Sequence, residues 1–382
     1  MRNNGHPPQR LRVLQVHAAL YVPNLLRTGL RRLGHRADTV AFGPRTAHRE
    51  LTGAPDYLLP SKWWALPQQS VFLAYALARY DVFHFWAQPH IIPPLYTSFT
   101  KHFPLDLAAI KKAGKKIVWQ SDGCYPMVRP TVWKTSIDPE VCFVCQTTQG
   151  DTYGHCSNDN TIHMNEAMSR YADLKFGMGL NLDFETGAEY VFFPVDLEKW
   201  HPGIDVPIQY RYQRRNADTV LIYHGVGSHV IGNRGNIKGT IWIHQTVAEL
   251  QQEGYNVELM HIERVPNEEV RFYQAQADIV VDQLLIGGGG QNARECLALG
   301  KPVLTRIHPQ QCEQFRKAAA PFSFPPYIPT DRLNLKTNLI RFIEDRSLRE
   351  RVGAESAEFA RQVLAPEAAA ERFAAHYRTL FQ

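Results

Sequence analysis

Four consecutive glycines, Gly287 to Gly290, separate an apolar run from a short helical stretch that carries a single acid, Glu295. Each glycine costs roughly 0.5–1 kcal/mol relative to alanine inside regular structure, so the run marks close backbone approach or positive φ. The flanking residues predict a buried strand, a helix that stops at Gly300, and a second strand. Free amides at the start of such a helix favour an anion. The alternative is a tight turn that binds no ligand.

Cysteines supply a second set of candidate ligands. The four that gather early in the chain are Cys124, Cys142, Cys145 and Cys156. Four thiolates are the number that a closed tetrahedral zinc site needs, and His155 or His163 can replace one of them. The surrounding insert, residues 124–163, is polar and offers little apolar material to fold it. The four cysteines therefore either hold a structural zinc ion or are reduced, unligated thiols.

The elements that would position these residues alternate between strand and helix. In the first half, an apolar strand at 11–20 precedes a leucine-spaced helix that stops at Gly34, and a second strand follows at 36–42. Helix-then-strand pairs recur at 71–87 and 105–120. Alternation of this kind predicts a parallel sheet covered on both faces.

The alternation stops in a proline-bearing stretch near residue 194 and then resumes. We therefore expect an α/β protein of two Rossmann-like doubly wound domains. The expected parts are a first domain of residues 1–193 with the cysteine-bearing insert 124–163, a second domain of residues 194–365, and a carboxy-terminal helix of residues 366–382. That helix can pack on either domain, including back on the first.

Length and charge limit the classes of function. With 382 residues, of which 44% are hydrophobic and 21% charged, the chain has the size of two ordinary domains. Its net charge of +5 fits an anionic substrate or a membrane surface, and it is too small and scattered to indicate nucleic acid. The amino terminus has no apolar signal core, and no stretch approaches the roughly 18 apolar residues that span a bilayer. We expect a cytoplasmic protein.

Four motifs in order resemble those of the retaining glycosyltransferases of the glycosyltransferase-B fold, in particular the family 4 group. "FFPVDLEKWHP" (192–202) is similar to that family's interdomain stretch, and "NIKGT" (236–240) to its Lys-Gly segment. "YQAQADIVVDQ" (273–283) and "ARECLALGKPVL" (293–304) are similar to the two segments that flank its glycine loop. The resemblance is good over residues 190–305, and over the first domain it is one of pattern only.

The resemblance implies two domains that face a cleft, a nucleotide-sugar donor held against the second domain, and catalysis without a cofactor. Lys238 matches the family's lysine that contacts the diphosphate, and Glu295 matches the carboxylate that holds the ribose hydroxyls. The amides of Gly288, Gly289 and Gly290 then lie near the phosphates. An ammonium group and helix-start amides can stabilise a departing diphosphate without a metal.

Two positions depart from the family's pattern. The family usually has a second glutamate, eight positions before the first, that contacts the donor sugar, and this sequence has Gly287 there. In the loop after residues 115–120, Asp122 stands where many relatives have a histidine. Asp122 either serves a polar or proton-relay role near the acceptor, or it caps a helix.

Other polar residues are weaker candidates. Ser228 and Arg234 lie in the glycine-rich loop before Lys238, where we expect them near the donor; Arg234 either contacts phosphate or is a solvated loop residue. His84 and His224 end predicted strands. We expect both to be hydrogen-bonded core histidines, and the alternative is that they face the cleft.

Exposed aromatic and basic residues bear on a membrane partner. Trp63 and Trp64 follow Lys62, and the lysine-rich run 111–116 comes later in the same domain. Family members that act on lipid-linked acceptors often dock on the inner membrane face through such features. These residues either form such a surface or are a tryptophan pair packed in the core and a solvated charge run.

Together with the resemblance, the sequence predicts a glycosyltransferase that moves a sugar, with retention, from a nucleotide-diphosphate donor to a saccharide or lipid-linked acceptor of a cell-surface polysaccharide or glycoconjugate. It would be cytoplasmic or peripheral to the membrane. One alternative is a nucleotide-sugar 2-epimerase on the same fold, which needs no acceptor. The other is a non-catalytic nucleotide-sugar-binding protein, which Gly287 favours.

Overall fold

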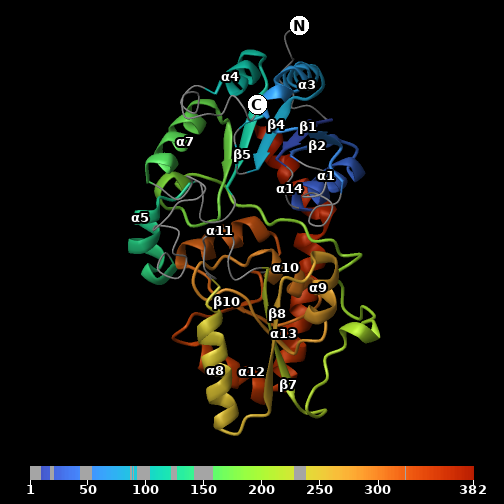
Figure 1. Cartoon of the computed structure of the whole chain (residues 1–382), viewed down its shortest axis with the longest axis vertical. Coiled ribbons are helices and arrows are strands. Elements are labelled where there is room, and N and C mark those ends of the chain that lie inside the picture. The colour runs from blue at the N-terminus through green and yellow to red at the C-terminus, as the bar shows by residue number, and fades with distance from the viewer. Residues whose placement is uncertain are drawn as a thin grey trace. The chain divides into compact units, whose positions relative to one another are not determined.

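The computed structural model describes residues 10–17, 21–43, 54–86, 88, 90–92, 104–121, 127–141, 158–227, 238–322 and 324–382. The chain forms two compact units (Figure 1). The described part of the first comes from residues 10–129, 158–194 and 366–382, and that of the second from residues 130–141 and 195–365. The chain therefore enters the second unit at Pro130, returns to the first, and leaves it again after Pro194.

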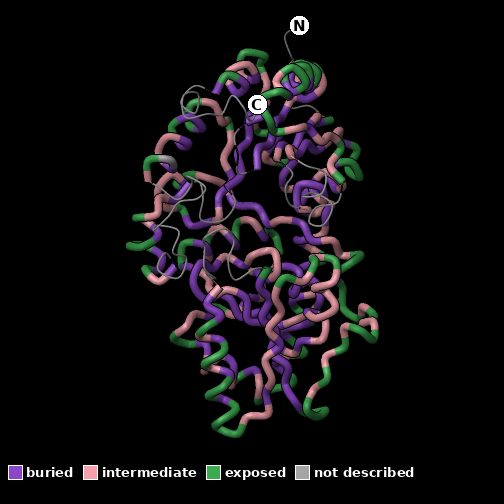
Figure 2. Tube along the Cα trace, viewed as in Figure 1, coloured by how far each residue is buried: buried purple, intermediate pink, exposed green. Residues whose placement is uncertain are grey.

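The first unit is built on a six-stranded parallel sheet with strand order β3-β2-β1-β4-β5-β6. Its strands are β1 (Arg12–Val16), β2 (Arg36–Phe42), β3 (Tyr57–Leu59), β4 (Val82–Trp86), β5 (Lys116–Gln120) and β6 (Leu174–Phe176). The strands read as apolar runs because both faces of the sheet are covered, as Figure 2 shows by their burial. In β1, for example, Val13 packs into the core on one face and Leu14 into the core on the other.

Helices cover the two faces of this sheet. They are α1 (Tyr21–Arg32), α3 (Leu66–Arg79), α4 (Leu105–Lys112), α7 (Asn158–Tyr171) and α14 (Pro366–Thr379), with short 3₁₀ turns at Trp63–Ala65 and Asp183–Glu185. Side chains of α1 and α14 share one core, and those of α3, α4 and α7 share the other. The carboxy-terminal helix thus completes the first unit, although the whole second unit precedes it in the chain.

The packing of α14 on α1 depends on Gly29. A Cβ at this position would lie 2.1 Å from the carbonyl oxygen of Pro366, so only glycine permits the observed approach of the two helices. Phe373 and Tyr377 of α14 are fully buried in the same core.

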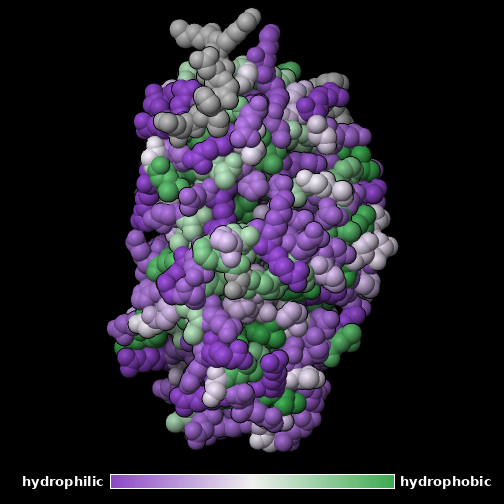
Figure 3. All heavy atoms as spheres, turned by 180° about the vertical axis from the view of Figure 1, so that it is seen from behind, coloured by the Kyte–Doolittle hydropathy of each residue, from purple (hydrophilic) through white to green (hydrophobic). Residues whose placement is uncertain are grey.

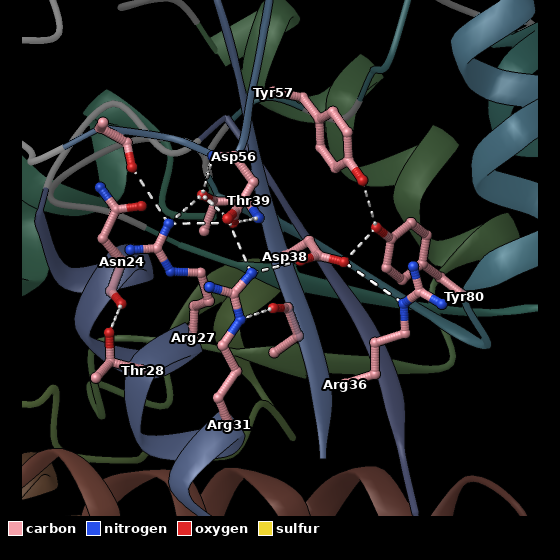
Figure 4. Close-up of polar contacts among 12 residues, drawn as sticks. Asn24, Arg27, Thr28, Arg31, Arg36, Asp38, Thr39, Asp56, Tyr57 and Tyr80 are labelled. Carbon is pink, nitrogen blue, oxygen red and sulfur yellow. Dashed lines mark hydrogen bonds and ion pairs between the residues drawn. The ribbon is translucent and has the colours of Figure 1, made fainter. Parts of the chain in front are cut away.

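The edge strand β3 has only three residues, and ionic and polar contacts of the preceding residue attach it to β2 and α1. Asp56, just before β3, accepts hydrogen bonds from the backbone amide of Thr39 at 2.9 Å and from Arg27 and Arg31 of α1 at 3.0 and 2.8 Å. Figure 4 shows both arginines reaching from α1 across the sheet edge toward this carboxylate. Asp56 therefore joins β3, β2 and α1.

The second unit is built on a five-stranded parallel sheet with strand order β11-β10-β9-β7-β8. Its strands are β7 (Val220–Val226), β8 (Val257–Glu263), β9 (Ile279–Val281), β10 (Val303–Thr305) and β11 (Tyr327–Pro329). Its helices are α5 (Pro130–Val132), α8 (Thr240–Gln252), α9 (Asn267–Gln274), α10 (Gln291–Ala298), α11 (Pro309–Ala319), α12 (Leu335–Glu344) and α13 (Arg346–Phe359), with π-helical turns at Trp133–Ile137 and Ala360–Leu364 and a 3₁₀ turn at Ile208–Tyr210. The two parallel sheets confirm the predicted α/β class.

The predicted strand at residues 277–286 is shorter than its apolar sequence suggests. Only Ile279–Val281 pairs as β9, and the chain leaves the sheet after Asp282, whose amide still donates to the carbonyl of Leu304 at 2.9 Å. The helix that follows the glycines begins at Gln291 and ends before Gly300, as expected for a helix stopped by glycine at φ +71.

Membrane-spanning helices are absent from the part of the chain that the structure describes. None of its helices has both the length and the apolar character that crossing a bilayer requires. On the face drawn in Figure 3, hydrophilic residues predominate and hydrophobic ones are interspersed among them.

Candidate functional site

The candidate site lies where the strand order of the second sheet changes direction. From β7 the chain passes through α8 to β8 on one side, and β9 returns on the other side of β7. In open parallel sheets, ligands bind at the carboxyl ends of strands at such a point. Gly225 near the end of β7, Lys238 before α8 and Asp282 after β9 all lie at this edge.

An ion pair occupies this edge. The ammonium group of Lys238 donates to Asp282 Oδ1 at 2.8 Å and to the carbonyl of Gly225 at 2.9 Å. The Asp282 side chain is fully buried, whereas the Lys238 side chain is 21% exposed. Burial alone would raise the pKa of Asp282, but the attraction and hydrogen bond of Lys238 outweigh it and lower that pKa. The pair is thus ionised, with its lysine on the outer side.

The backbone fixes Lys238 at this position. Its carbonyl accepts a hydrogen bond from the amide of Leu284 at 3.0 Å, which ties the residue to the loop after β9. Gly239 then turns the chain into α8 at φ +88, and a Cβ there would approach Leu284 Cβ to 3.0 Å.

A chain of hydrogen bonds connects this ion pair to Glu295. Asn292 of α10 donates to Asp282 Oδ1 at 2.9 Å and accepts from Tyr223 and Gln274, both at 3.0 Å. Gln274 also donates to Glu295 Oε2 at 3.1 Å. Glu295 is 2% exposed. Lys238 and Glu295, predicted from the sequence to act together, therefore belong to one polar network at one edge of the sheet.

Two further residues complete the support of Glu295. Asn267, at the start of α9, donates to Glu295 Oε1 at 3.4 Å, and Trp200 donates from its indole nitrogen to Gln274 Oε1 at 2.9 Å. Each carboxylate oxygen of Glu295 thus has a side-chain amide donor, which fixes the orientation of the group.

The glycine run is shaped by contacts within the protein. Gly287, Gly288 and Gly289 have φ values of +77, +86 and +58, in the left-handed region that favours glycine. Side chains there would meet close neighbours: a Cβ on Gly289 would lie 2.6 Å from the ring of Tyr327, and one on Gly287 would lie 2.6 Å from the carbonyl oxygen of Arg306. At Gly287 and Gly289, contacts within the protein therefore require glycine without any ligand. At Gly288, glycine is favoured by φ, because the nearest neighbour is the flexible end of Gln311.

The same contacts leave no room for a side chain at position 287. The amide of Gly288 donates to the carbonyl of Arg306 at 2.9 Å, which holds the turn against that residue. Arg306 is itself fixed, because it pairs with Asp138 and donates to the carbonyl of Ile137 at 3.0 Å. A glutamate at position 287 does not fit this backbone.

His84 and His224 are both hydrogen-bonded core residues, as predicted. His224 donates from Nδ1 to the carbonyl of Val281 at 2.8 Å and accepts from the Thr240 hydroxyl at 2.6 Å. Burial, reinforced by Lys238, lowers its pKa to about 3, so it is neutral. His84 is fully buried in the first unit, where Nδ1 lies 2.7 Å from the hydroxyl of Tyr377, and burial lowers its pKa to about 3.

The first unit has a polar cluster at its own change of strand direction, between β1 and β4. His17 follows β1 with φ +64, an uncommon value for a residue with a side chain, and its Nε2 lies 2.6 Å from the carbonyl of His90. The two rings meet edge to face at 4.4 Å, and Phe42 at the end of β2 packs against His17 at 4.8 Å. Burial lowers the pKa of His17 to about 4, so the ring is neutral at pH 7. Since the carbonyl of His90 can only accept, Nε2 carries the proton and donates.

Asp282 and His17 belong to no motif that the sequence alone indicates. A signal for each existed, because both residues directly follow a buried strand. Their partners are 44 and 73 residues away in the chain, however, and no local pattern indicates such contacts.

The remaining predicted site residues lie outside the described residues. They are Asp122, Ser228, Arg234, Cys124, Cys142, Cys145 and Cys156. Within the described ranges no group of three or more acidic, histidine or cysteine side chains is arranged to hold a metal ion. Two cysteines there, Cys296 and Cys312, are free thiols.

Comparison of the whole fold with solved structures decides its class. The sucrose-phosphate synthase of Thermosynechococcus elongatus matches with a TM-score of 0.60 and 13% identity, covering 97% of this chain and 99% of that one. The catalytic domain of starch synthase IV from Arabidopsis thaliana matches at 0.56 and 11% identity, with 97% and 99% covered. A glycosyltransferase from Rickettsia africae matches at 0.54 and 10% identity, with 98% and 100% covered.

The chain has the glycosyltransferase-B fold. At these identities the likeness concerns the fold alone. No protein-family model matches the sequence, and no curated protein sequence matches it either. Each sheet is the centre of one Rossmann-like domain of this fold. The polar clusters at Lys238 and at His17 lie at the carboxyl ends of the strands of the second and first sheet, respectively.

Proposed function

We propose that this protein is a glycosyltransferase that transfers a sugar from a nucleotide-diphosphate donor. One observation carries the proposal: Lys238, the start of α10 and the buried Glu295 meet at the point of the second sheet where ligands of parallel sheets bind. The glycosyltransferase-B fold supports it. The starch synthase IV structure with this fold is bound to ADP, the class of ligand proposed for this site.

In the proposed site, Lys238 and the amides of Gly289 and Gly290 face the diphosphate. The amide of Gly288, also expected there from the sequence, donates to the carbonyl of Arg306 instead. The negative charge of a diphosphate leaving group grows as the bond to the sugar breaks, and a fixed ammonium group stabilises that charge. Glu295 accepts hydrogen bonds from the ribose hydroxyls. Its orientation by Gln274 and Asn267 prepares the carboxylate for this role. These groups need no metal ion or cofactor, and we propose none for catalysis.

The acceptor is assigned to the first unit. We propose that Nδ1 of His17 accepts a hydrogen bond from the acceptor hydroxyl, because Nε2 is committed to the carbonyl of His90. Asp122 remains a proposed polar residue of the same side. A His17→Gln variant should raise the KM for acceptor and leave the affinity for the donor nucleotide unchanged; equal effects on both would contradict the assignment.

The acceptor class remains the saccharide or lipid-linked saccharide of a surface polymer, and transfer with retention is part of the proposal. Trp63 and Trp64 are 76% and 59% exposed, so the alternative of a core-packed pair is wrong. The basic run is less available than the sequence suggests, because Lys111 and Lys115 pair with Asp173 and Asp81. Sedimentation with anionic vesicles tests a peripheral membrane contact: a Trp63→Ala and Trp64→Ala double variant should bind less, and unchanged binding would exclude this surface.

A structural zinc ion on Cys124, Cys142, Cys145 and Cys156 also remains a proposal. Metal analysis of protein purified without chelator tests it. About one equivalent of zinc supports the site, and four freely titratable thiols in folded, zinc-free protein would refute it.

One observation favours a second candidate function, a nucleotide-sugar-binding protein without turnover. The acid that contacts the donor sugar in the family is replaced by Gly287, and the backbone there excludes a side chain. Incubation with a panel of nucleotide sugars separates the candidates. Nucleotide release that depends on an acceptor supports transfer, release without an acceptor indicates a 2-epimerase, and binding without release indicates the non-catalytic protein. Nuclear magnetic resonance of the product's anomeric proton tests retention.

A further inference from the structure

We infer that Asp282 tunes the charge of Lys238, so that the site binds a nucleoside diphosphate weakly enough to release it after each reaction. The inference rests on the proposed function and adds a positioning residue to it. The similar family motif supplies no role for Asp282, and the structure alone brings it to Lys238. The hydrogen bonds, the burial and the charge of Asp282 support this inference.

The contacts of Asp282 do not by themselves require a charge. Its Oδ1 accepts from Lys238 at 2.8 Å and from Asn292 at 2.9 Å, and an asparagine oxygen accepts the same two bonds. Its Oδ2 is buried and has no hydrogen-bond partner among the residues that the structure describes. A buried, half-satisfied carboxylate is costly to keep. The negative charge therefore has a role beyond holding the geometry.

The burial of Asp282 beneath Lys238 shows that the carboxylate acts on a ligand only indirectly. The carboxylate is fully buried, and the lysine side chain lies on its outer side, 21% exposed. A ligand arriving at the carboxyl ends of the strands meets the ammonium group rather than the carboxylate. Asp282 therefore acts on a ligand through Lys238, by orienting its ammonium group and by cancelling part of its charge.

The electrostatic consequence follows from the pairing. The two charges sum to zero, and Lys238 lowers the pKa of Asp282, so the carboxylate is ionised at neutral pH. An anionic diphosphate is attracted by a dipole instead of by a net positive charge. This weakens binding of the product, and product release limits turnover in many enzymes.

The test is calorimetric titration of UDP, GDP and ADP into wild-type protein and an Asp282→Asn variant. The variant keeps the shape and the two accepted hydrogen bonds but removes the negative charge that Asp282 places beside Lys238. We expect its dissociation constant for the preferred nucleotide to fall about tenfold, which corresponds to about 1.4 kcal/mol. Turnover should fall together with the donor KM, because the product leaves more slowly. A Lys238→Met variant should show the opposite change in affinity.

Asp278→Asn is the matched control. Asp278 lies at the other end of β9 and pairs with Arg214 at 2.5 Å, so this substitution also removes an ion pair from the same strand but should leave nucleotide affinity unchanged. If Asp282→Asn fails to fold, Asp282→Ser supplies the same neutral acceptor in a smaller side chain. Unchanged or weaker nucleotide binding by the folded variant would overturn the inference. Failure of wild-type protein to bind any nucleotide would instead overturn the proposed function.

Discussion

At the scale of single residues, the candidate site depends on side chains that the protein holds in place before any ligand arrives. Both oxygens of Glu295 accept from side-chain amides, and Lys238 is fixed by Asp282, by Gly225 and by its own backbone. Preorganised charges of this kind stabilise a developing charge without reorganisation during the reaction. The network therefore suits a site for an anionic leaving group.

The glycine run gives a residue-scale prediction. Gly289→Ala should lower the free energy of unfolding by about 1–3 kcal/mol, because φ is +58 and the added methyl group meets the Tyr327 ring. Gly290→Ala is the matched control: φ there is −57, and the nearest atom to its Cβ is the flexible end of Gln283. Urea denaturation of both variants measures the difference, and equal stabilities would show that the contacts at Gly289 relax freely.

At the scale of elements, the alternation of strand and helix was readable from the sequence, and the ends of strands were not. The apolar residues 277–286 predict one long strand, but β9 stops at Val281. The amide of Asp282 still donates to the carbonyl of Leu304, while its side chain pairs with Lys238. Similarly, nothing local to Asp56 predicts that its carboxylate joins β3 to α1, since Arg27 and Arg31 lie 29 and 25 residues earlier. Hydrophobic periodicity predicts elements, whereas long-range polar pairs place the site.

The edge of the first sheet gives an element-scale prediction about pH. Burial would raise the pKa of Asp56, but Arg31, the Thr39 amide and Arg27 outweigh it and lower that pKa in the folded protein. The stabilisation is therefore complete above the unfolded value of about 3.9 and is lost as pH falls through the folded pKa. Asp56→Ala should cost about 1–3 kcal/mol at pH 7 and progressively less toward pH 3.

Urea denaturation from pH 3 to pH 7 measures this difference. Asp218→Ala, which removes an exposed carboxylate of the second unit, should give a small difference without the same loss at low pH. A pH-independent cost of Asp56→Ala would mean that shape rather than charge at this residue holds β3.

At the scale of the whole molecule, each unit has its own sheet and core, and the chain does not divide between them at a single point. Helix α14 follows the second unit in sequence and fills the core of the first. The sequence predicted an amphipathic helix there, but its docking depends on the close approach at Gly29, 337 residues before Pro366, which no periodicity indicates.

This arrangement predicts separable stabilities. Phe373→Ala should lower the melting temperature of the first unit, because removing a fully buried phenylalanine costs about 3–5 kcal/mol. The preferred nucleotide should raise the melting temperature of the second unit, which holds Lys238 and Glu295. Differential scanning calorimetry should then show two transitions that respond separately. A single transition shifted by both changes would mean that the units unfold together.

The proposed site requires that Lys238 and Glu295 hold a nucleotide-diphosphate group at the edge of the second sheet. The most direct measurement is calorimetric titration of the preferred nucleoside diphosphate into wild-type, Lys238→Ala and Glu295→Ala proteins, with folding checked by circular dichroism. Loss of a hydrogen bond to a charged group should weaken binding by about 1.5–3 kcal/mol in each variant. With the nucleotide sugar as substrate, Lys238→Ala should also lower turnover beyond its effect on affinity. Wild-type affinity in both folded variants would contradict the site.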